Sequence, residues 1–154
     1  MKIFAFFLLL FFTSATQAQM QTSFSLGLGT SYGGLGAKLR TEAFEGYYLF
    51  GGAGLMYYSS LGGAAYGWQT GIEKSFANDR HGLSASYGAL SARTISETNL
   101  IYYGPSLNYA YYFSGFGRST WLIGGSAYRG ELEDNDYGFE ATTTGVAFLV
   151  GYQF

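Results

Sequence analysis

Cysteine is absent from this chain, and proline and charged residues are scarce. Without cysteine the protein has no disulfide, no thiolate metal ligand, no cysteine nucleophile and no lipoprotein anchor. Charged residues make up 12% of the chain, against about 25% in an average domain. The formal net charge is only −2, so composition gives no electrostatic basis for binding nucleic acid.

Glycine and aromatic residues take the place of the missing charge. The chain contains 24 Gly, 15 Tyr and 14 Phe, and it has no long segment with a helical period. Such a composition is typical of strands that face lipid on one side and a crowded lumen on the other.

The first residues have the pattern of an export signal. Lys2 precedes an unbroken apolar run, Ile3 to Phe12, and small residues follow as far as Ala18. This run is too short for the roughly 20 residues of a membrane-spanning helix. We therefore expect residues 1–18 to be a cleaved signal peptide and residues 19–154 to form one β-barrel domain.

Stretches of alternating apolar and small or polar residues, separated by turn-like clusters, fill the rest of the chain. Most have about the 9–11 residues that a tilted membrane strand needs. We predict eight strands: Phe24–Tyr32, Leu35–Phe44, Tyr47–Tyr58, Ala65–Phe76, Gly82–Ser91, Leu100–Phe113, Thr120–Arg129 and Glu140–Phe154. The longest connections, Ala92–Asn99 and Gly130–Phe139, then fall on the same side, as outer loops do in membrane barrels.

The two faces of these stretches differ in kind. In the first, Phe24 and Leu26 alternate with Ser25 and Gly27. A soluble barrel would turn the apolar face inward, but Gly and Ser would then make up its outer surface and solubilise it poorly. The inverted arrangement predicts an all-β fold, an eight-stranded antiparallel up-and-down transmembrane β-barrel.

Three places leave the phase of a strand open. The stretch Tyr47–Tyr58 has Tyr and Gly on both faces. Pro105 lies within the sixth stretch, where its missing N–H costs a ladder bond, so it marks a bulge or a later strand start. Without a bulge at Gly124 and Gly125, Arg129 faces outward; with one, it points into the lumen.

The last stretch carries the most specific pattern, with apolar residues at every second position: Phe148, Val150, Tyr152 and Phe154. With these residues the chain resembles the small eight-stranded outer-membrane barrels of Gram-negative bacteria, the OmpA/OmpX type. The resemblance implies residence in the bacterial outer membrane. It also implies that this terminal strand is the signal read by the barrel-assembly machinery.

Charged residues on the small-residue face are candidates for a lumen polar network. Lys38, Arg40 and Glu42 share this face of the second stretch, and Glu73 lies on that of the fourth. In a narrow lumen, opposite charges should pair, because unpaired buried charge is costly. One reading is a charged gate over a small conduit, and the other, which we favour, is a structural plug.

An acidic outer loop is predicted between the last two strands, with Glu131, Glu133, Asp134 and Asp136 and then Glu140. Carboxylates bind hard cations, but the calcium-loop pattern is not met. We expect a solvated loop without a resident metal or cofactor. A further hypothesis is that it shares divalent cations with lipopolysaccharide phosphates.

His81 is the sole histidine and lies in a predicted periplasmic turn beside Asp79 and Arg80. A lipid A-modifying barrel would need its base at the opposite end, so we expect no enzyme. Aromatic residues near the stretch ends are predicted to form interface girdles: Tyr47, Tyr57, Tyr58, Tyr66, Trp68, Tyr111, Phe113, Trp121, Tyr152 and Phe154.

Together these patterns predict a monomeric barrel with a structural or surface-interaction role through its outer loops. Its expected partners are outer-membrane lipid, lipopolysaccharide and the barrel-assembly machinery. The alternatives are a narrow pore for ions or small solutes, a lipid A-modifying enzyme and a soluble lipocalin-like binder with an apolar cavity.

Overall fold

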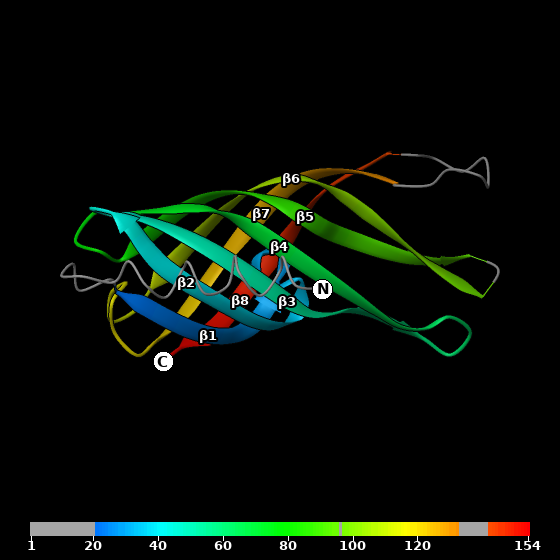
Figure 1. Ribbon diagram of the computed structural model, residues 1–154, viewed down its shortest axis with the longest axis horizontal. Helices are drawn as coiled ribbons and strands as arrows, with labels where there is room; N and C mark the ends of the chain where they lie inside the picture. The colour runs from blue at the N-terminus through cyan, green and yellow to red at the C-terminus, as the bar shows by residue number, and fades with distance from the viewer. Residues whose placement is uncertain (1–20, 96, 133–141) are drawn as a thin grey trace, which may run out of the picture.

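Eight antiparallel strands close into a barrel in the computed structural model, which describes residues 21–95, 97–132 and 142–154. Each strand pairs with the next along the chain, and β8 pairs with β1 (Figure 1). The predicted all-β, eight-stranded antiparallel barrel is confirmed. No helix within the described ranges is long and apolar enough to cross a membrane.

The strand bounds follow the alternating stretches closely. They are β1 Thr22–Gly29, β2 Gly34–Phe44, β3 Tyr47–Ser59, β4 Gly63–Phe76, β5 His81–Ile95, β6 Thr98–Tyr112, β7 Thr120–Leu132 and β8 Thr142–Gln153, with one 3₁₀ turn, η1, at Thr30–Tyr32. Two expectations were wrong. The first strand stops at Gly29, before η1, and most of the expected loop Ala92–Asn99 is strand, because Ile95 pairs with Thr98.

The predicted division between the two faces is also confirmed. Side chains such as Phe24, Leu26 and Leu39 point outward and are exposed, whereas Ser25 and Lys38 are buried inside. The lumen is therefore the polar side of the wall, and the outer surface is a belt of aliphatic and aromatic side chains. We call the end where β1 begins and β8 ends the near rim, and the opposite end the far rim.

The structure fixes the three open phases. In β3, Tyr48 and Phe50 point inward, and a register shift between Leu55 and Tyr57 changes the phase beyond it. Both ladders of β7 run through Gly124 and Gly125 without a shift, so Arg129 faces outward.

Pro105 neither bulges nor ends its strand. It pairs with Tyr87 on the β5 side. On the β7 side the ladder has no pair at Gly104 or Pro105 and resumes at Ser106 in the same register. The missing proline N–H therefore interrupts one ladder locally, and β6 continues.

The two halves of the wall are built differently (Figure 1). From the near rim to the level of η1, which we call the near half, every neighbouring pair of strands is hydrogen-bonded. Beyond η1, in the far half, the β1–β8 ladder stops at Leu28 and Val150, and the β4–β5 ladder stops at Gln69 and Gly88. The β3–β4, β5–β6 and β7–β8 hairpins then diverge as separate tips.

Candidate functional site

A cluster of charged and polar side chains, the lumen cluster, crosses the near half of the lumen. Glu73 lies at its centre, with its Oε2 3.4 Å from Lys38 Nζ and 3.5 Å from Arg40 Nη1. The Tyr112 hydroxyl donates a hydrogen bond of 2.8 Å to the other carboxylate oxygen and accepts one of 3.0 Å from Arg40. The three charged residues are at most 4% exposed, so they are a buried ion-pair network.

The lumen cluster is tied to the turn between β6 and β7. This turn folds back so that Phe116 is buried, with the Arg40 guanidinium carbon 3.5 Å from its ring centroid. The Phe116 carbonyl accepts hydrogen bonds of 2.6 Å each from Arg40 and Gln153. Arg40 also donates to the Gln153 side-chain oxygen. The turn thus forms a cover over the near end of the lumen.

The lumen cluster contains two cations and one carboxylate. Aromatic faces and carbonyl oxygens offset the excess positive charge, because a ring face and a carbonyl both present negative potential to a cation. Lys38 Nζ lies 5.2 Å from the Phe50 ring centroid and 5.5 Å from that of Tyr32. Tyr48 provides a further face, 5.1 Å from the Arg40 guanidinium carbon.

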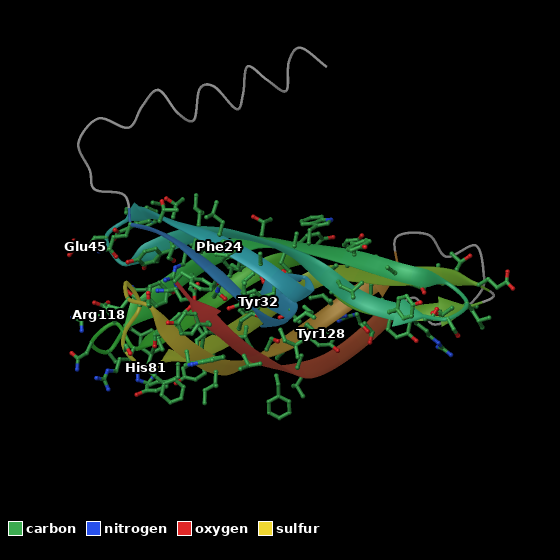
Figure 2. The ribbon with its side chains drawn as sticks, turned by 90° about the horizontal axis from the view of Figure 1, so that it is seen from below. Phe24, Tyr32, Glu45, His81, Arg118 and Tyr128 are labelled. Carbon is green, nitrogen blue, oxygen red and sulfur yellow. The ribbon has the colours of Figure 1, made fainter. Side chains whose placement is uncertain are left out.

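The turn η1 fills the lumen from the other side. Tyr32 is fully buried and points into the centre of the barrel (Figure 2). Its ring occupies space that a Cβ at Gly27 would take, 2.6 Å from the ring. Gly33, with a φ of 64°, reverses the chain after the turn, a conformation that favours glycine.

Hydroxyl and amide groups around Asn108 form a second polar network, which includes Thr30 of η1. Thr30 donates to Asn108 at 2.8 Å and contacts the Ser126 hydroxyl at 2.9 Å. Asn108 in turn donates to Ser84 and Ser86. The lumen cluster, this second network and the Tyr32 ring together occupy the lumen.

Of the four residues predicted for the lumen polar network, the structure brings Lys38, Arg40 and Glu73 together. Glu42 lies outside the lumen cluster, partly exposed near the rim, and its carboxylate accepts a hydrogen bond of 3.2 Å from the Gly46 amide. Glu42 pairs with the inward-facing Tyr48 in the register of Lys38 and Arg40, and the register shift of β2 begins only after it. It keeps the predicted face, but at the rim it forms no ion pair with Lys38, Arg40 or Glu73, so it does not join the lumen cluster.

His81 belongs to an aromatic group at the near rim. Its Nδ1 lies 2.8 Å from the Tyr109 hydroxyl, and its ring stacks on Phe76 at 5.5 Å and contacts Tyr111 edge-on at 5.2 Å. No carboxylate is hydrogen-bonded to this ring among the described residues. The side chain serves as an aromatic element of the rim.

Of the predicted assembly signal, Phe148, Val150 and Tyr152 lie on the outward face of β8, and Phe154 follows its last residue. Tyr152 contacts Trp121 at 5.3 Å and Phe154 at 5.0 Å between ring centroids. Phe24 stacks on Phe154 across the β1–β8 seam at 5.9 Å. These contacts continue the aromatic row across the closure of the barrel.

Of the predicted acidic loop, one residue lies within the described part of the chain. Glu131 is an exposed residue of β7, while Glu133, Asp134, Asp136 and Glu140 lie outside the described residues. Within the described residues no group of three or more acidic, His or Cys side chains could hold a metal ion.

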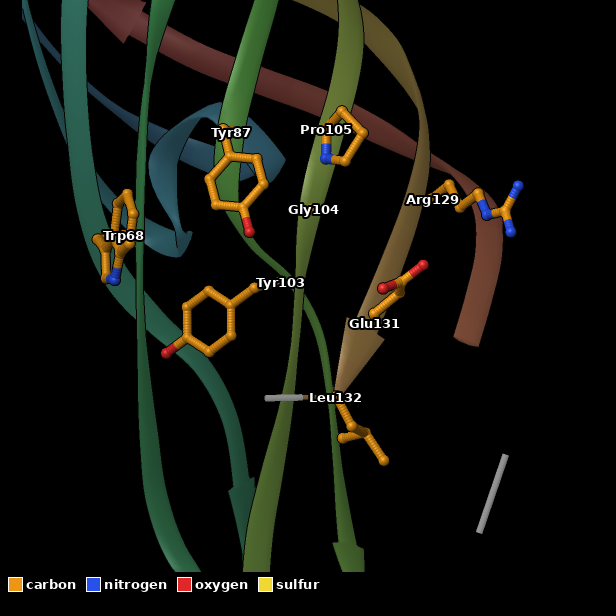
Figure 3. Close-up of a pocket in the computed structure, with 8 residues that line it drawn as sticks. All are labelled: Trp68, Tyr87, Tyr103, Gly104, Pro105, Arg129, Glu131 and Leu132. Atoms are coloured by element: carbon orange, nitrogen blue, oxygen red, sulfur yellow. The ribbon is translucent and has the colours of Figure 1, made fainter. Parts of the chain in front are cut away.

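A groove on the outward face brings together residues that sequence reasoning assigned only to girdles or left unassigned. Its volume is about 490 Å³. Trp68, Tyr87 and Tyr103 gather on one side of it, and the Arg129 side chain extends away from these rings (Figure 3). The only signal in the sequence was their shared outward phase on three strands. Because the Arg129 side chain points away from the three aromatic rings, we assign no ligand to this groove.

Comparison with protein-family models, with curated proteins and with solved structures found no match.

Proposed function

We propose that the chain is an integral β-barrel of a bacterial outer membrane, with a structural or surface-interaction role through the loops of its far rim. The observation that carries this proposal is the inverted wall: Phe148 is 90% exposed, while Arg40 and Glu73 are 2% exposed in the lumen. Burying charge and exposing a continuous apolar belt is unfavourable in water. In a bilayer the same belt faces hydrocarbon, and in the near half the closed ladder satisfies the backbone.

The structural role is supported by the side chains that fill the lumen: the lumen cluster, the polar network around Asn108 and the Tyr32 ring of η1. A conduit would require a water-filled path past Glu73, Asn108 and Tyr32, which are hydrogen-bonded across the lumen or packed within it. The pore alternative predicts conductance above background in planar bilayers. We expect none.

Surface interaction is assigned to the far rim, because hairpins β3–β4, β5–β6 and β7–β8 all end there. Lipopolysaccharide and outer-membrane lipid are the partners that such a belt and rim would meet. The terminal residues Phe148, Val150, Tyr152 and Phe154 are the segment offered to the barrel-assembly machinery. An enzymatic role has no support in the position of His81, whose partners are aromatic residues of the near rim.

Cell fractionation combined with a gel run with and without boiling tests the proposal. A closed membrane barrel keeps its fold in cold detergent and unfolds on boiling, so we expect an outer-membrane band that shifts with heat. A periplasmic band without a shift would overturn the proposal and favour the lipocalin-like alternative. Insertion into a bilayer then serves as the second measurement, by flotation of the refolded chain with phospholipid vesicles.

A further inference from the structure

A cleft in the far half of the wall suggests a specific lipid-side ligand. The β1–β2 hairpin is short, and η1 folds into the lumen, so both strands are missing from the wall beyond this level. The β1–β8 ladder ends at Leu28 and Val150, and the β2–β3 ladder ends at Leu35 and Leu55. Among the described residues, β8 beyond Val150 is paired only with β7, and β3 beyond Leu55 only with β4.

The exposed fraction of the outward β8 side chains rises where the pairing with β1 ends. Val150, which has a β1 neighbour, is 40% exposed. Phe148 and Val146 lie on the same face, two and four residues further along the strand, and are 90% and 82% exposed. They stand beside the gap on one side and beside Gly125 and Ala127 of β7 on the other.

A cavity of about 360 Å³ lies in the gap, between the hairpin, β3, β5 and β8. Its apolar side chains are Leu28, Met56, Leu90, Ala92, Ala147 and Phe148. Leu28 and Phe148 belong to the outward belt, whereas Leu90 is buried. The cavity thus opens from the outer face of the wall toward the mouth of the lumen, and its volume is at the lower end for small-molecule sites.

The polar part of this lining is neutral. It consists of the hydroxyls of Tyr57 and Ser91 together with backbone groups of the hairpin, and it includes no charged side chain. The Thr30 hydroxyl is already hydrogen-bonded to Asn108 and Ser126 in the lumen. An ionised head group would lose its hydration here without gaining a partner of opposite charge, which is costly. A neutral head can instead hydrogen-bond to the Tyr57 and Ser91 hydroxyls and to unpaired edge groups of β8, which hydrocarbon alone would leave unsatisfied.

We propose that this lateral cleft binds one neutral, single-chain amphiphile. Its alkyl tail lies against Phe148, Met56 and Leu28, and its head reaches the hydroxyls of Ser91 and Tyr57. One tail matches the size of the cavity, and a lining that combines apolar side chains with uncharged hydroxyls selects an amphiphile over plain hydrocarbon. The site rests on the proposed membrane residence of the barrel and goes beyond it by naming a ligand class.

The test uses the full chain refolded into phosphatidylcholine vesicles and dodecanol carrying an aliphatic diazirine as the probe. After photolysis, mass spectrometry maps the adducts. We expect them to concentrate on segments containing Met56 and Phe148, to be competed by unlabelled dodecanol and to resist dodecyl phosphate. Even labelling along the apolar belt would overturn the proposal, and equal competition by dodecyl phosphate would overturn its neutral head.

A matched pair of variants adds a steric test. Ala92→Phe fills the cleft and should lower adduct yield there about tenfold, the loss expected when two methylene groups lose their burial. Ala85→Phe makes the same change on the exposed outward face of β5, away from the cleft lining, and should leave the yield unchanged. Equal yields in the two variants would count against the site.

The competition experiment on the unmodified chain tests binding in the cleft even if Ala92→Phe does not fold. The shift of the gel band on boiling reports whether each sample is folded. Failure of the underlying proposal has a different signature. A chain that does not float with vesicles and shows no heat shift is not a membrane barrel. A chain that floats, shifts and labels evenly is a membrane barrel without this site.

Discussion

The near and far halves of the barrel use the same eight strands in different ways. In the near half every ladder is complete, and the lumen cluster joins β2, β4, β6, β8 and the β6–β7 turn through buried hydrogen bonds. In the far half the β1–β8, β2–β3 and β4–β5 ladders stop and hairpins diverge. We therefore expect the free energy of unfolding to depend mainly on the near half, where strand pairing and polar cross-links coincide.

The largest effect on this comparison is expected from Glu73→Gln. The change leaves Lys38 and Arg40 buried without their carboxylate, and breaking a buried pair costs about 3–5 kcal/mol. Urea unfolding from vesicles should show this loss of free energy of unfolding. The control Glu131→Gln, on the exposed part of β7, should change it by less than about 0.5 kcal/mol.

Phe116→Ala tests whether Phe116, in the turn that covers the near end of the lumen, stabilises the fold as a core residue does. The ring is buried against Arg40, Tyr48 and Tyr112, and removing a buried phenyl typically costs about 3 kcal/mol. The same unfolding measurement applies. Phe113→Ala, at an exposed position of the same turn region, is the matched control, and equal losses would show that Phe116 is no core residue.

Gly27→Ala addresses the boundary between the halves. The new Cβ would meet the Tyr32 ring at 2.6 Å and the Val150 carbonyl oxygen at 2.5 Å, so η1 or β8 must shift. Overpacking of this kind costs about 1–3 kcal/mol. Gly51→Ala, whose nearest neighbour would be 4.0 Å away, should be neutral or slightly stabilising, and an equal loss there would refute the packing argument.

The smallest expected effect is a difference in amide hydrogen exchange between two segments of β4. In β4, residues Gln69–Phe76 pair with β5, whereas Gly63–Trp68 pair only with β3. Amide hydrogen exchange by NMR in micelles should be at least about tenfold faster in the second segment, because opening there breaks fewer contacts. Equal exchange rates along β4 would contradict the expected difference in local stability between the near and far halves.

Alternation along the chain was sufficient to predict eight strands and the inward and outward faces of most of them, but it left the phases of β3 and β7 open. It could not predict η1, because Thr30–Tyr32 continue the local strand pattern, and only the space beside Gly27 turns them inward. Likewise Phe116 lies in a segment with turn composition, and its burial depends on Arg40 and Gln153 from distant strands. Glu42 has the predicted face, but alternation does not say how far along the lumen a residue lies, and Glu42 is at the rim, where it bonds the Gly46 amide.

The seam between β1 and β8 sets the order in which the barrel can mature. Ser25 pairs with Gln153, and the Phe154 amide donates to the Phe24 carbonyl. The pairing of β1 is therefore completed only after β8 has been synthesised. Arg40 also takes its amide partner from the last strand. Neither the wall nor the lumen cluster can therefore be finished during synthesis. Until β8 is available, β1 has an unpaired edge, and such an edge together with exposed apolar side chains makes an intermediate prone to aggregation.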